Sequence, residues 1–377
     1  MKGKQGMVCM GLLLVLSSCH TGKQITASGL QRKDFQTEVN GQHTDLFTLS
    51  NKQGMEVCIT NYGARVVSIL VPDRNGKRED VVCGFSTITE YMEQRQNFGS
   101  TVGRYIGRIL NARFTLDGVE YKLVPNNGKS GHISHGGNPG FADRIWKVEQ
   151  ADTHRVRLSY LSPDGENGFP GNLKVTLVYS LGEDDNALDL TYEATTDAPT
   201  VLNLSHHSFF NISGNFTKSV EDQQLWVDAD RFTPYDDKKC VTGEYLPVAG
   251  TPLDFRMPHT IGECIDADHP QLKVVNGYDH TWELNTKGDD TRPAAWVYDP
   301  ASGRKMEIFT TEPGMQIYTG NGLKGKMTGK RGIAYPFRSA VCFETMHFQD
   351  SPNQPGFPST VLRPGEVFRS HTVYKFE

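Results

Sequence analysis

The sequence has no block of Lys or Arg, no long apolar run beyond its N-terminus and little helical periodicity. It carries 39 Lys and Arg against 44 Asp and Glu, which gives a formal net charge of −5. The absence of a basic patch argues against a nucleic-acid partner. Beyond the N-terminus, no apolar run approaches the roughly 20 residues that a membrane-spanning helix needs. The 377 residues are enough for one large β domain or two ordinary domains.

The N-terminus has the pattern of a targeting segment. Lys2 and Lys4 form a basic start, and residues 7–16 form an apolar run that is too short to span a membrane. The run ends in the tetrapeptide LSSC, residues 16–19. This tetrapeptide resembles a bacterial lipobox, in which the cysteine is lipidated and becomes the mature N-terminus. The alternative is an ordinary secretory signal with an incidental cysteine.

We therefore predict a lipoprotein signal peptide over residues 1–19, with Cys19 as the lipidated residue. An acylated Cys19 would hold an exported protein at a membrane surface, in the periplasm or on the cell surface. Polar residues 20–34 are expected to form a flexible tether. Five of the seven cysteines remain once the signal and Cys19 are set aside, and their spacing matches neither a disulfide framework nor a metal site. Cys58 and Cys342 lie in alternating apolar runs, which indicates small core residues.

After residue 34, short strands dominate the pattern. Residues 173–181 alternate between apolar and polar side chains, and residues 188–193 do the same. Residues 114–121 predict a hairpin with Asp117-Gly118 as its two-residue turn. Further strands are expected at 55–60, 66–71 and 156–161, and a turn or two of helix at 87–94.

Many short strands with Gly and Pro between them are typical of an all-β sandwich or barrel. No linker-like change of composition follows residue 40. We predict one large antiparallel β-sandwich domain over residues 35–377.

Residues 202–211, LNLSHHSFFN, are the most informative segment for function. Neighbouring residues of a strand point to opposite faces, so His206 and His207 cannot do the same job. One of them is expected to enter a site lined by Asn side chains and an aromatic ring, as in a sugar pocket. Imidazole exchanges a proton near neutral pH more readily than other side chains.

Other polar motifs are ambiguous alone. Arg104 and Arg108, on a Gly-rich segment predicted as a strand, could bind sugar hydroxyls or form surface salt bridges. His135 precedes two glycines and could project into a cleft or cap a turn. Asp279 could accept hydrogen bonds from two vicinal hydroxyls or be an ordinary turn residue. Glu344 ends an apolar strand, where burial would raise its pKa toward that of a general base, or where an Arg could hold it in an ion pair.

Taken together, these motifs resemble the aldose 1-epimerase family, also called mutarotases. The resemblance runs from about residue 35 to the C-terminus, and its motifs follow in the family's order. The matching segments are residues 61–64 (NYGA), 102–109 (VGRYIGRI), 135–137 (HGG), 203–211 (NLSHHSFFN), 277–280 (GYDH), 318–321 (YTGN) and 343–345 (FET).

The resemblance implies a β-sandwich fold and a role for each matching residue. Glu344 matches the general base that takes the proton of the anomeric hydroxyl, and His207 matches the general acid that protonates the ring oxygen. The ring opens, the C1–C2 bond rotates and reclosure gives the other anomer of a glucose- or galactose-type aldose. Acid–base chemistry of this kind requires no cofactor and no metal. His206 is then expected to point away from the site.

The resemblance also supplies a sugar-binding set. Arg108 and His135 match residues that hydrogen-bond the sugar, Asp279 matches a carboxylate that grips hydroxyls, and Gln316 matches a further pocket residue. Phe209 and Trp282 could pack on the C–H surface of the sugar, or belong to the core.

Three positions depart from the family pattern. Gly107, which we also include in the predicted sugar-binding set, stands where many relatives have Asn; Ser134 stands where Leu is usual, and His132 where Asn is usual. These changes leave the preferred sugar open. His132 and His135 have no carboxylate or cysteine at ligand spacing, so we expect no metal site there.

Two rival functions remain at this point. A glycoside-processing enzyme would use Glu344 and Asp279 about 5–9 Å apart across a glycosidic bond, and would leave His207 without a role. A surface sugar-binding lipoprotein would bind a sugar without accelerating anomer exchange. The expected partners are a free monosaccharide and a membrane surface, and the chain is expected to be a monomer.

Overall fold

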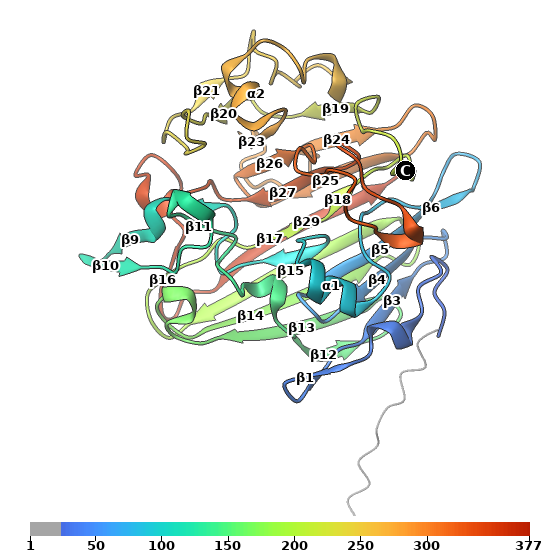
Figure 1. Ribbon diagram of the computed structural model, residues 1–377, viewed down its shortest axis with the longest axis horizontal. Helices are drawn as coiled ribbons and strands as arrows, with labels where there is room; N and C mark the ends of the chain where they lie inside the picture. The colour runs from blue at the N-terminus through green and yellow to red at the C-terminus, as the bar shows by residue number, and fades with distance from the viewer. Residues whose placement is uncertain (1–23) are drawn as a thin grey trace, which may run out of the picture.

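The computed structural model describes residues 24–377, and within that range the chain folds into antiparallel sheets with two short α-helices (Figure 1). The predicted all-β antiparallel sandwich is confirmed. The predicted signal peptide and the lipid anchor on Cys19 lie outside the described residues. No helix within residues 24–377 is both long and apolar enough to cross a membrane.

Within this range, the largest sheet has nine strands in the order β12-β13-β14-β15-β29-β25-β24-β19-β22. Burial alternates along β14 and β15, as the sequence predicted, so one face of this sheet is apolar and must be covered. The strands are β12 (Lys147–Ala151), β13 (Arg155–Ser162), β14 (Leu173–Leu181), β15 (Ala187–Thr196), β19 (Gln224–Val227), β22 (His259–Thr260), β24 (Ala295–Tyr298), β25 (Lys305–Thr310) and β29 (Phe368–Phe376).

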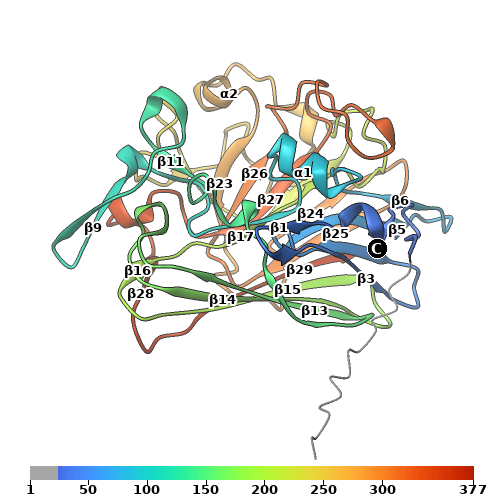
Figure 2. The same ribbon diagram turned by 60° about the horizontal axis from the view of Figure 1, so that its bottom comes forward.

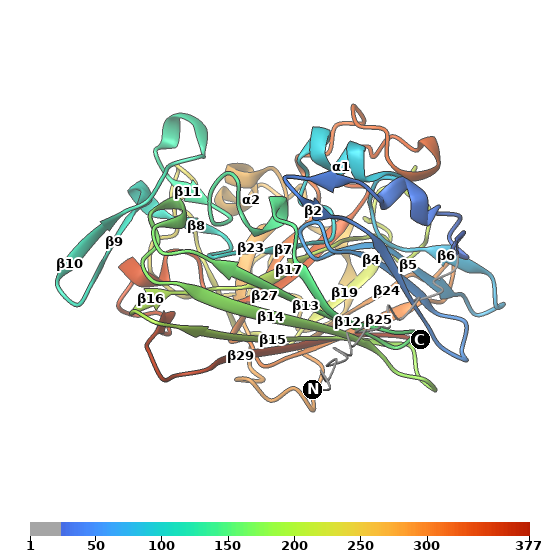
Figure 3. The ribbon, with the colours of Figure 1, turned by 90° about the horizontal axis from the view of Figure 1, so that it is seen from below.

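A six-stranded sheet, in the order β18-β27-β26-β23-β20-β21, lies over that apolar face (Figure 2). Figure 3, seen from below, shows β14, β15 and β29 crossing in front of β23 and β27. The strands of the smaller sheet are β18 (Phe209–Phe210), β20 (Arg231–Thr233), β21 (Leu246–Pro247), β23 (Asp279–Glu283), β26 (Gly314–Tyr318) and β27 (Val341–Met346).

The main hydrophobic core lies between these two sheets. Leu177 of β14 and Leu190 of β15 belong to the same buried cluster as Met315 of β26 and Phe343 of β27. Because side chains alternate along a strand, the opposite faces of β26 and β27 point away from this core. Those faces are therefore free to line a site.

A four-stranded sheet, β3-β4-β5-β6, flanks the sandwich, and several two-stranded pairs complete the described residues. These strands are β1 (Glu38–Val39), β2 (Gln42–His43), β3 (Leu46–Ser50), β4 (Glu56–Thr60), β5 (Arg65–Pro72), β6 (Arg78–Asp80), β7 (Ser100–Val102), β8 (Arg108–Ile109), β9 (Arg113–Leu116), β10 (Val119–Lys122), β11 (Ile133–Ser134), β16 (Thr200–Val201), β17 (Ser205–His207) and β28 (Val361–Leu362).

Local sequence signals explain the tight turn and the helices. The β9–β10 hairpin turns at Asp117 (φ 51°) and Gly118 (φ 78°), which confirms the predicted two-residue turn. Helix α1 (Ile88–Gln94) begins with a capping box between Thr87 and Glu90, which confirms the helical prediction there. Helix α2 covers Pro270–Val275. The 3₁₀ turns are Arg32–Phe35, Leu110–Ala112, Gly128–Ser130, Phe141–Asp143, Glu166–Gly168, Ile261–Glu263, Lys330–Gly332 and Ser351–Asn353.

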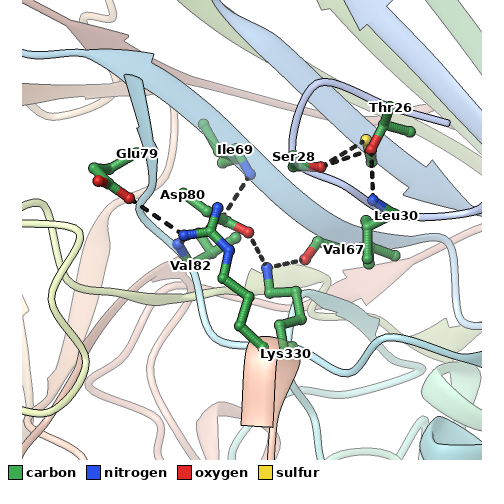
Figure 4. A network of polar contacts seen from close by, with 12 residues as sticks. Thr26, Ser28, Leu30, Val67, Ile69, Glu79, Asp80, Val82 and Lys330 are labelled. Atoms are coloured by element: carbon green, nitrogen blue, oxygen red, sulfur yellow. Dashed lines mark hydrogen bonds and ion pairs between the residues drawn. The ribbon is translucent and has the colours of Figure 1, made fainter. Parts of the chain in front are cut away.

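The flexible tether predicted for residues 20–34 is wrong over residues 24–34, which lie against the sandwich. Leu30 is buried, and its backbone N–H donates to Thr26 Oγ1 at 2.9 Å (Figure 4). Ser28 N–H donates to Glu56 Oε1 of β4 at 3.2 Å. The polar groups of this segment form hydrogen bonds with one another and with the neighbouring strand. The segment is therefore ordered despite its polar composition.

A buried ion pair ties the edge of the four-stranded sheet to a distant turn. Lys330 Nζ donates to Asp80 Oδ2 and to the carbonyl oxygen of Val67, both at 2.5 Å (Figure 4). Asp80 Oδ1 also accepts the backbone N–H groups of Ile69 and Val82, at 3.2 and 3.3 Å. Every charged atom of the pair is thus partnered, as buried charges require.

Candidate active site

Glu344 and Gln316 lie side by side because β26 and β27 pair in register. Gln316 is the direct partner of Glu344 across the ladder, and Thr281 of β23 is the partner of Gln316 on its other side. Phe343, the neighbour of Glu344, points into the core and packs on Phe210. The alternation of β27 therefore turns Glu344 to the opposite face, where it is 4% exposed.

His207 reaches Glu344 through the same antiparallel register. Phe209 of β18 pairs with Cys342 of β27, and the segment before Phe209 continues alongside β27. Two residues back from Phe209 and two beyond Cys342, the register brings His207 beside Glu344. His207 Nε2 lies 3.6 Å from Glu344 Oε1.

His206 points the other way, as the strand argument predicted. Its Nε2 lies 2.6 Å from Ser208 Oγ, and its ring contacts Tyr179 and Tyr374 in the core. Burial lowers the pKa of His206 to about 3, so the ring is neutral. His206 is a structural residue, and His207 alone of the two faces the site.

Arg108 and His135 enter from the opposite wall, on the short pair β8–β11. Ser134 pairs with Arg108, and the N–H of His135 donates to the carbonyl of Gly107 at 2.9 Å. His135 has φ 51°, a left-handed turn conformation, and Gly136 follows with φ 77°. The turn aims the His135 ring at His207, with ring centres 5.5 Å apart.

These walls enclose a cavity of about 240 Å³. It is smaller than the sites that hold drug-sized ligands, which suits a single sugar ring. All eight residues predicted for the site line it: Gly107, Arg108, His135, His207, Phe209, Asp279, Gln316 and Glu344. It is also lined by Gln96, Asn97, Ser134, Tyr318, Met346 and Gln349.

Of these additional residues, Gln349, Met346, Gln96 and Asn97 were not proposed from the sequence. Met346 could have been found, because it lies two residues beyond Glu344 and so shares its face of β27. Gln96 and Asn97 follow helix α1, and Gln349 follows β27. Residues in such connections have no periodicity that assigns them a direction.

Burial sets the protonation of the central pair. Desolvation lowers the pKa of His207 well below its usual range, and the nearby His135 ring adds to the effect. Desolvation raises the pKa of Glu344 well above its usual range, and the carboxylate of Asp279 adds to it. Both shifts favour a pair that holds one proton, with that proton on Glu344 while the cavity is empty.

Phe209 forms one side of the cavity beside His207 and Glu344. Its ring stacks on the His207 ring, with ring centres 5.0 Å apart and an interplanar angle of 9°. The Tyr318 ring packs edge-to-face with the Phe209 ring, with ring centres 5.9 Å apart. Stacking fixes the orientation of the His207 ring, which has a buried Nδ1 without a hydrogen-bond partner. Phe209 therefore holds His207 in addition to lining the cavity.

Asp279 and Arg108 are further charged residues that line the cavity. Gln316 Nε2 donates to Asp279 Oδ1 at 2.7 Å, and burial raises the pKa of Asp279 while Arg108 opposes the rise. The Arg108 guanidinium lies over the Tyr235 ring at 6.0 Å. Arg108 and Asp279 therefore offer a donor fork and a carboxylate to hydroxyl groups.

Two residues considered from the sequence lie elsewhere. Arg104 is 2% exposed and donates to backbone carbonyls in the 162–171 segment, so it holds loops together. The predicted strand over 102–109 is interrupted, because β7 ends at Val102 and β8 begins at Arg108. Trp282 packs on Phe255 and Tyr278 in the core and does not line the cavity.

Histidine and cysteine also meet at two places near the cavity. His132 accepts the N–H of Asn111 at Nδ1, 2.9 Å away, and its Nε2 faces Cys240 Sγ at 3.3 Å. Within residues 24–377, the donor atoms of His207, Cys342 and Glu344 lie within 4.8 Å of one another. Burial raises the pKa of the Cys342 thiol well above its usual range, which disfavours the thiolate that metal ligation needs. The group fits an acid–base pair better than a metal centre.

The fold and the site define a β-sandwich enzyme with a buried acid–base pair in a small polar cavity. The aldose 1-epimerase family model matches residues 45–375. Galactose mutarotase of Sus scrofa is 39% identical over 330 residues, which cover 88% of this chain and 93% of that protein. Aldose 1-epimerase of Escherichia coli strain K12 is 36% identical over 340 residues, 89% and 96% of the two chains.

A solved structure agrees with these relatives. The aldose epimerase homologue of C. elegans superposes with a TM-score of 0.81 at 31% identity, and covers 89% of this chain and 99% of that one. The chain belongs to the aldose 1-epimerase family, whose members are isomerases.

Proposed function

We propose that the protein interconverts the α and β anomers of a free aldose of the glucose or galactose type, with Glu344 and His207 as its acid–base pair. The observation that carries the proposal is the separation of 3.6 Å between His207 Nε2 and Glu344 Oε1 inside the cavity. Anomer exchange must remove a proton from one oxygen and deliver a proton to another, and two adjacent groups of different type can do both.

The steps balance without a cofactor. Glu344 as carboxylate takes the proton of the C1 hydroxyl, while His207 as imidazolium gives a proton to the ring oxygen and the bond between C1 and that oxygen breaks. The C1–C2 bond of the open aldehyde rotates. Closure then forms the ring bond on the other face of C1, as His207 takes back the hydroxyl proton and Glu344 returns a proton to the oxygen on C1.

A pair with one proton suits both directions. Opening uses the form with the proton on His207, and closing uses the form with the proton on Glu344. Burial favours the second form in the empty cavity. Hydroxyl groups of a bound sugar would donate to the carboxylate and stabilise the first form, since hydrogen bonds to a charged group favour its ionisation.

The remaining polar residues suit a sugar ring. We assign Arg108 and His135 to the ring oxygen and C1 end, and Asp279 with Gln316 to hydroxyls farther round the ring. Asp279 is already oriented by Gln316 at 2.7 Å, so its second oxygen is available to a hydroxyl. A glycosidase mechanism on Glu344 and Asp279 would leave the contact between His207 and Glu344 without a purpose, so we do not adopt it.

Polarimetry on freshly dissolved α-glucose and α-galactose tests the proposal. Protein lacking residues 1–19 should accelerate the decay of optical rotation over the buffer rate. Glu344→Gln and His207→Asn should each lower kcat by about 10²- to 10⁴-fold, the usual contribution of a general acid or base. Decay equal to that of buffer across a panel of hexoses and pentoses would refute the proposal.

We also propose that the protein is exported and anchored to a membrane through a lipidated Cys19, in the periplasm or on the cell surface, and acts there as a monomer. The support is the basic start, the short apolar run and the LSSC tetrapeptide. Metabolic labelling with a radioactive fatty acid should mark the protein, and Cys19→Ala should abolish both the label and sedimentation with membranes. A labelled Cys19→Ala protein would refute the anchor, and light scattering on soluble protein would show whether it is a single chain.

A further inference from the structure

Gln349 lies in the cavity and is 4% exposed, yet the acid–base mechanism gives it no role. It follows Glu344 by five residues, just beyond the end of β27. Its Nε2 donates to Tyr235 Oη at 2.6 Å and faces Gln316 Oε1 at 3.3 Å. Its Oε1 accepts the backbone N–H of Arg108 at 3.3 Å.

These partners fix the orientation of the Gln349 amide. The backbone N–H of Arg108 can only donate, so the atom facing it must be the carbonyl oxygen. Gln316 Oε1 can only accept, so the atom facing it must be the amide nitrogen. Both hydrogens of Nε2 are used, whereas Oε1 has one long hydrogen bond and a second lone pair without a partner. The group that Gln349 can offer to a ligand is therefore an acceptor.

Gly107 makes room for this side chain. A Cβ atom on residue 107 would lie 2.6 Å from Gln349 Cγ, which is closer than two non-bonded carbon atoms approach each other. Gly107 also has φ 76°, where a side chain is strained. A side chain on residue 107 would occupy this part of the wall. The amide enters from residue 349 instead.

The segment that carries Gln349 is held firmly against the segment that carries Arg108. The N–H of Asp350 donates to the carbonyl of Arg108 at 2.8 Å, and Asp350 Oδ1 accepts the N–H of Leu110 at 3.0 Å. Asn353 and Gln354 donate to the same carboxylate at 2.7 and 2.9 Å. A residue fixed in this way can discriminate between ligands, because it cannot move aside at little cost.

We propose that Gln349 is a specificity-determining residue, whose side-chain carbonyl accepts a hydrogen bond from one hydroxyl of the sugar in the space left open by Gly107. The inference rests on the proposed anomer exchange and adds to it the group that reads a hydroxyl. A site that hydrogen-bonds a hydroxyl disfavours a sugar lacking it, because the acceptor is left unpaired.

The test uses sugars that differ from glucose at one carbon: galactose at C4, 2-deoxyglucose at C2 and xylose at C6. The variant Gln349→Met keeps the length of the side chain and removes its carbonyl. The matched control is Gln223→Met, at a glutamine that is also buried and hydrogen-bonded but lies outside the cavity. For each purified protein, kcat and KM are measured for every sugar, and thermal unfolding is recorded.

We expect Gln349→Met to raise KM for sugars that carry the recognised hydroxyl by about 3- to 10-fold, the effect of one neutral hydrogen bond. The sugar that lacks this hydroxyl should be affected less, so the ratio of kcat/KM between the pair should shift by the same factor. Gln223→Met should leave these ratios unchanged. An equal loss for all sugars, or no loss, would overturn the inference; absence of activity in the unaltered protein would refute the proposed function instead.

A second arm tests the coupling with Gly107. Gly107→Asn should lower kcat/KM for every sugar, because its Cβ displaces Gln349. Gln349→Ala in the Gly107→Asn background should recover part of that activity by removing the Cγ atom in conflict. Effects that multiply independently in the double variant would contradict the shared space that the inference requires.

Discussion

Replacing Arg104 with Lys is expected to lower stability, whereas the same change at Arg108 is expected to lower activity. Arg104 uses one terminal nitrogen for the carbonyls of Pro170 and Gly171, at 2.7 and 3.0 Å. It uses the other for the carbonyls of Ser162 and Pro163, both at 3.2 Å. A lysine ammonium can occupy the place of only one of these nitrogens.

Two buried carbonyls therefore lose their donor in Arg104→Lys. Each such loss costs about 1–3 kcal/mol, so the free energy of unfolding should fall by about 2–6 kcal/mol. At about 2 °C per kcal/mol for a chain of this size, Tm should fall by at least about 4 °C. Burial lowers the pKa of Arg104 to about 10, because desolvation disfavours its charged form.

Arg108 donates to the carbonyl of Lys239 at 3.5 Å and lies over the Tyr235 ring, and does not share the set of buried backbone carbonyls that Arg104 holds. Arg108→Lys should therefore change Tm by less than about 2 °C but lower kcat/KM by about 10-fold or more, because the planar donor fork is lost. Differential scanning calorimetry and polarimetry on both variants give the comparison. An Arg104→Lys protein of unchanged Tm, or an Arg108→Lys protein of full activity, would refute the assignment of the two residues.

Three further predictions concern titration and buried charge. The profile of kcat/KM against pH should be bell-shaped. Its acid limb should lie below pH 6.5, because burial lowers the pKa of His207, and its alkaline limb well above pH 4.5, because burial raises the pKa of Glu344. An acid limb above pH 6.5 would contradict this prediction. Because burial raises the pKa of Glu344, its ionisation is less favourable in the folded state than in the unfolded state, and the folded state loses stability as pH rises past 4.5. In urea titrations, Glu344→Gln should therefore be more stable than the unaltered protein at pH 8 and equally stable at pH 4. If the variant and the unaltered protein were equally stable at both pH values, the predicted direction of the Glu344 pKa shift would be contradicted. Lys330→Met leaves Asp80 buried without its cation and should lower the free energy of unfolding by about 3–5 kcal/mol in urea titrations, whereas a loss below about 1 kcal/mol would show that the pair is dispensable.

The sequence predicted those features that depend on local periodicity. Alternation along residues 173–181 and the Asp-Gly turn at 117–118 gave correct strands and a correct hairpin. The same two-residue period separated His206 from His207, and the structure places the first in the core and the second in the cavity. The residues assigned by resemblance to the family line one cavity. The ladder of β23, β26 and β27 brings Asp279, Gln316 and Glu344 together in it.

The features that the sequence could not predict depend on contacts far apart in the chain. Arg104 and Arg108 look alike in a Gly-rich motif, and only the position of the 162–171 carbonyls separates them. Residues 24–34 are polar, but their order comes from a buried Leu30 and from Glu56 on a neighbouring strand. Gln349 follows its strand in an irregular connection, where no repeat indicates which way a side chain points.

The most direct test of the central claim is the activity of the double variant Glu344→Gln/His207→Asn. If the two side chains act as one pair sharing a proton, removing the second after the first should cost little more, as for residues that function as a unit. Nuclear magnetic resonance exchange between the α and β anomeric protons of glucose measures the rates of both single variants and the double variant. We expect the rate of the double variant to be within about threefold of that of the slower single variant. A double variant slower by the product of the two single losses would contradict a shared acid–base pair.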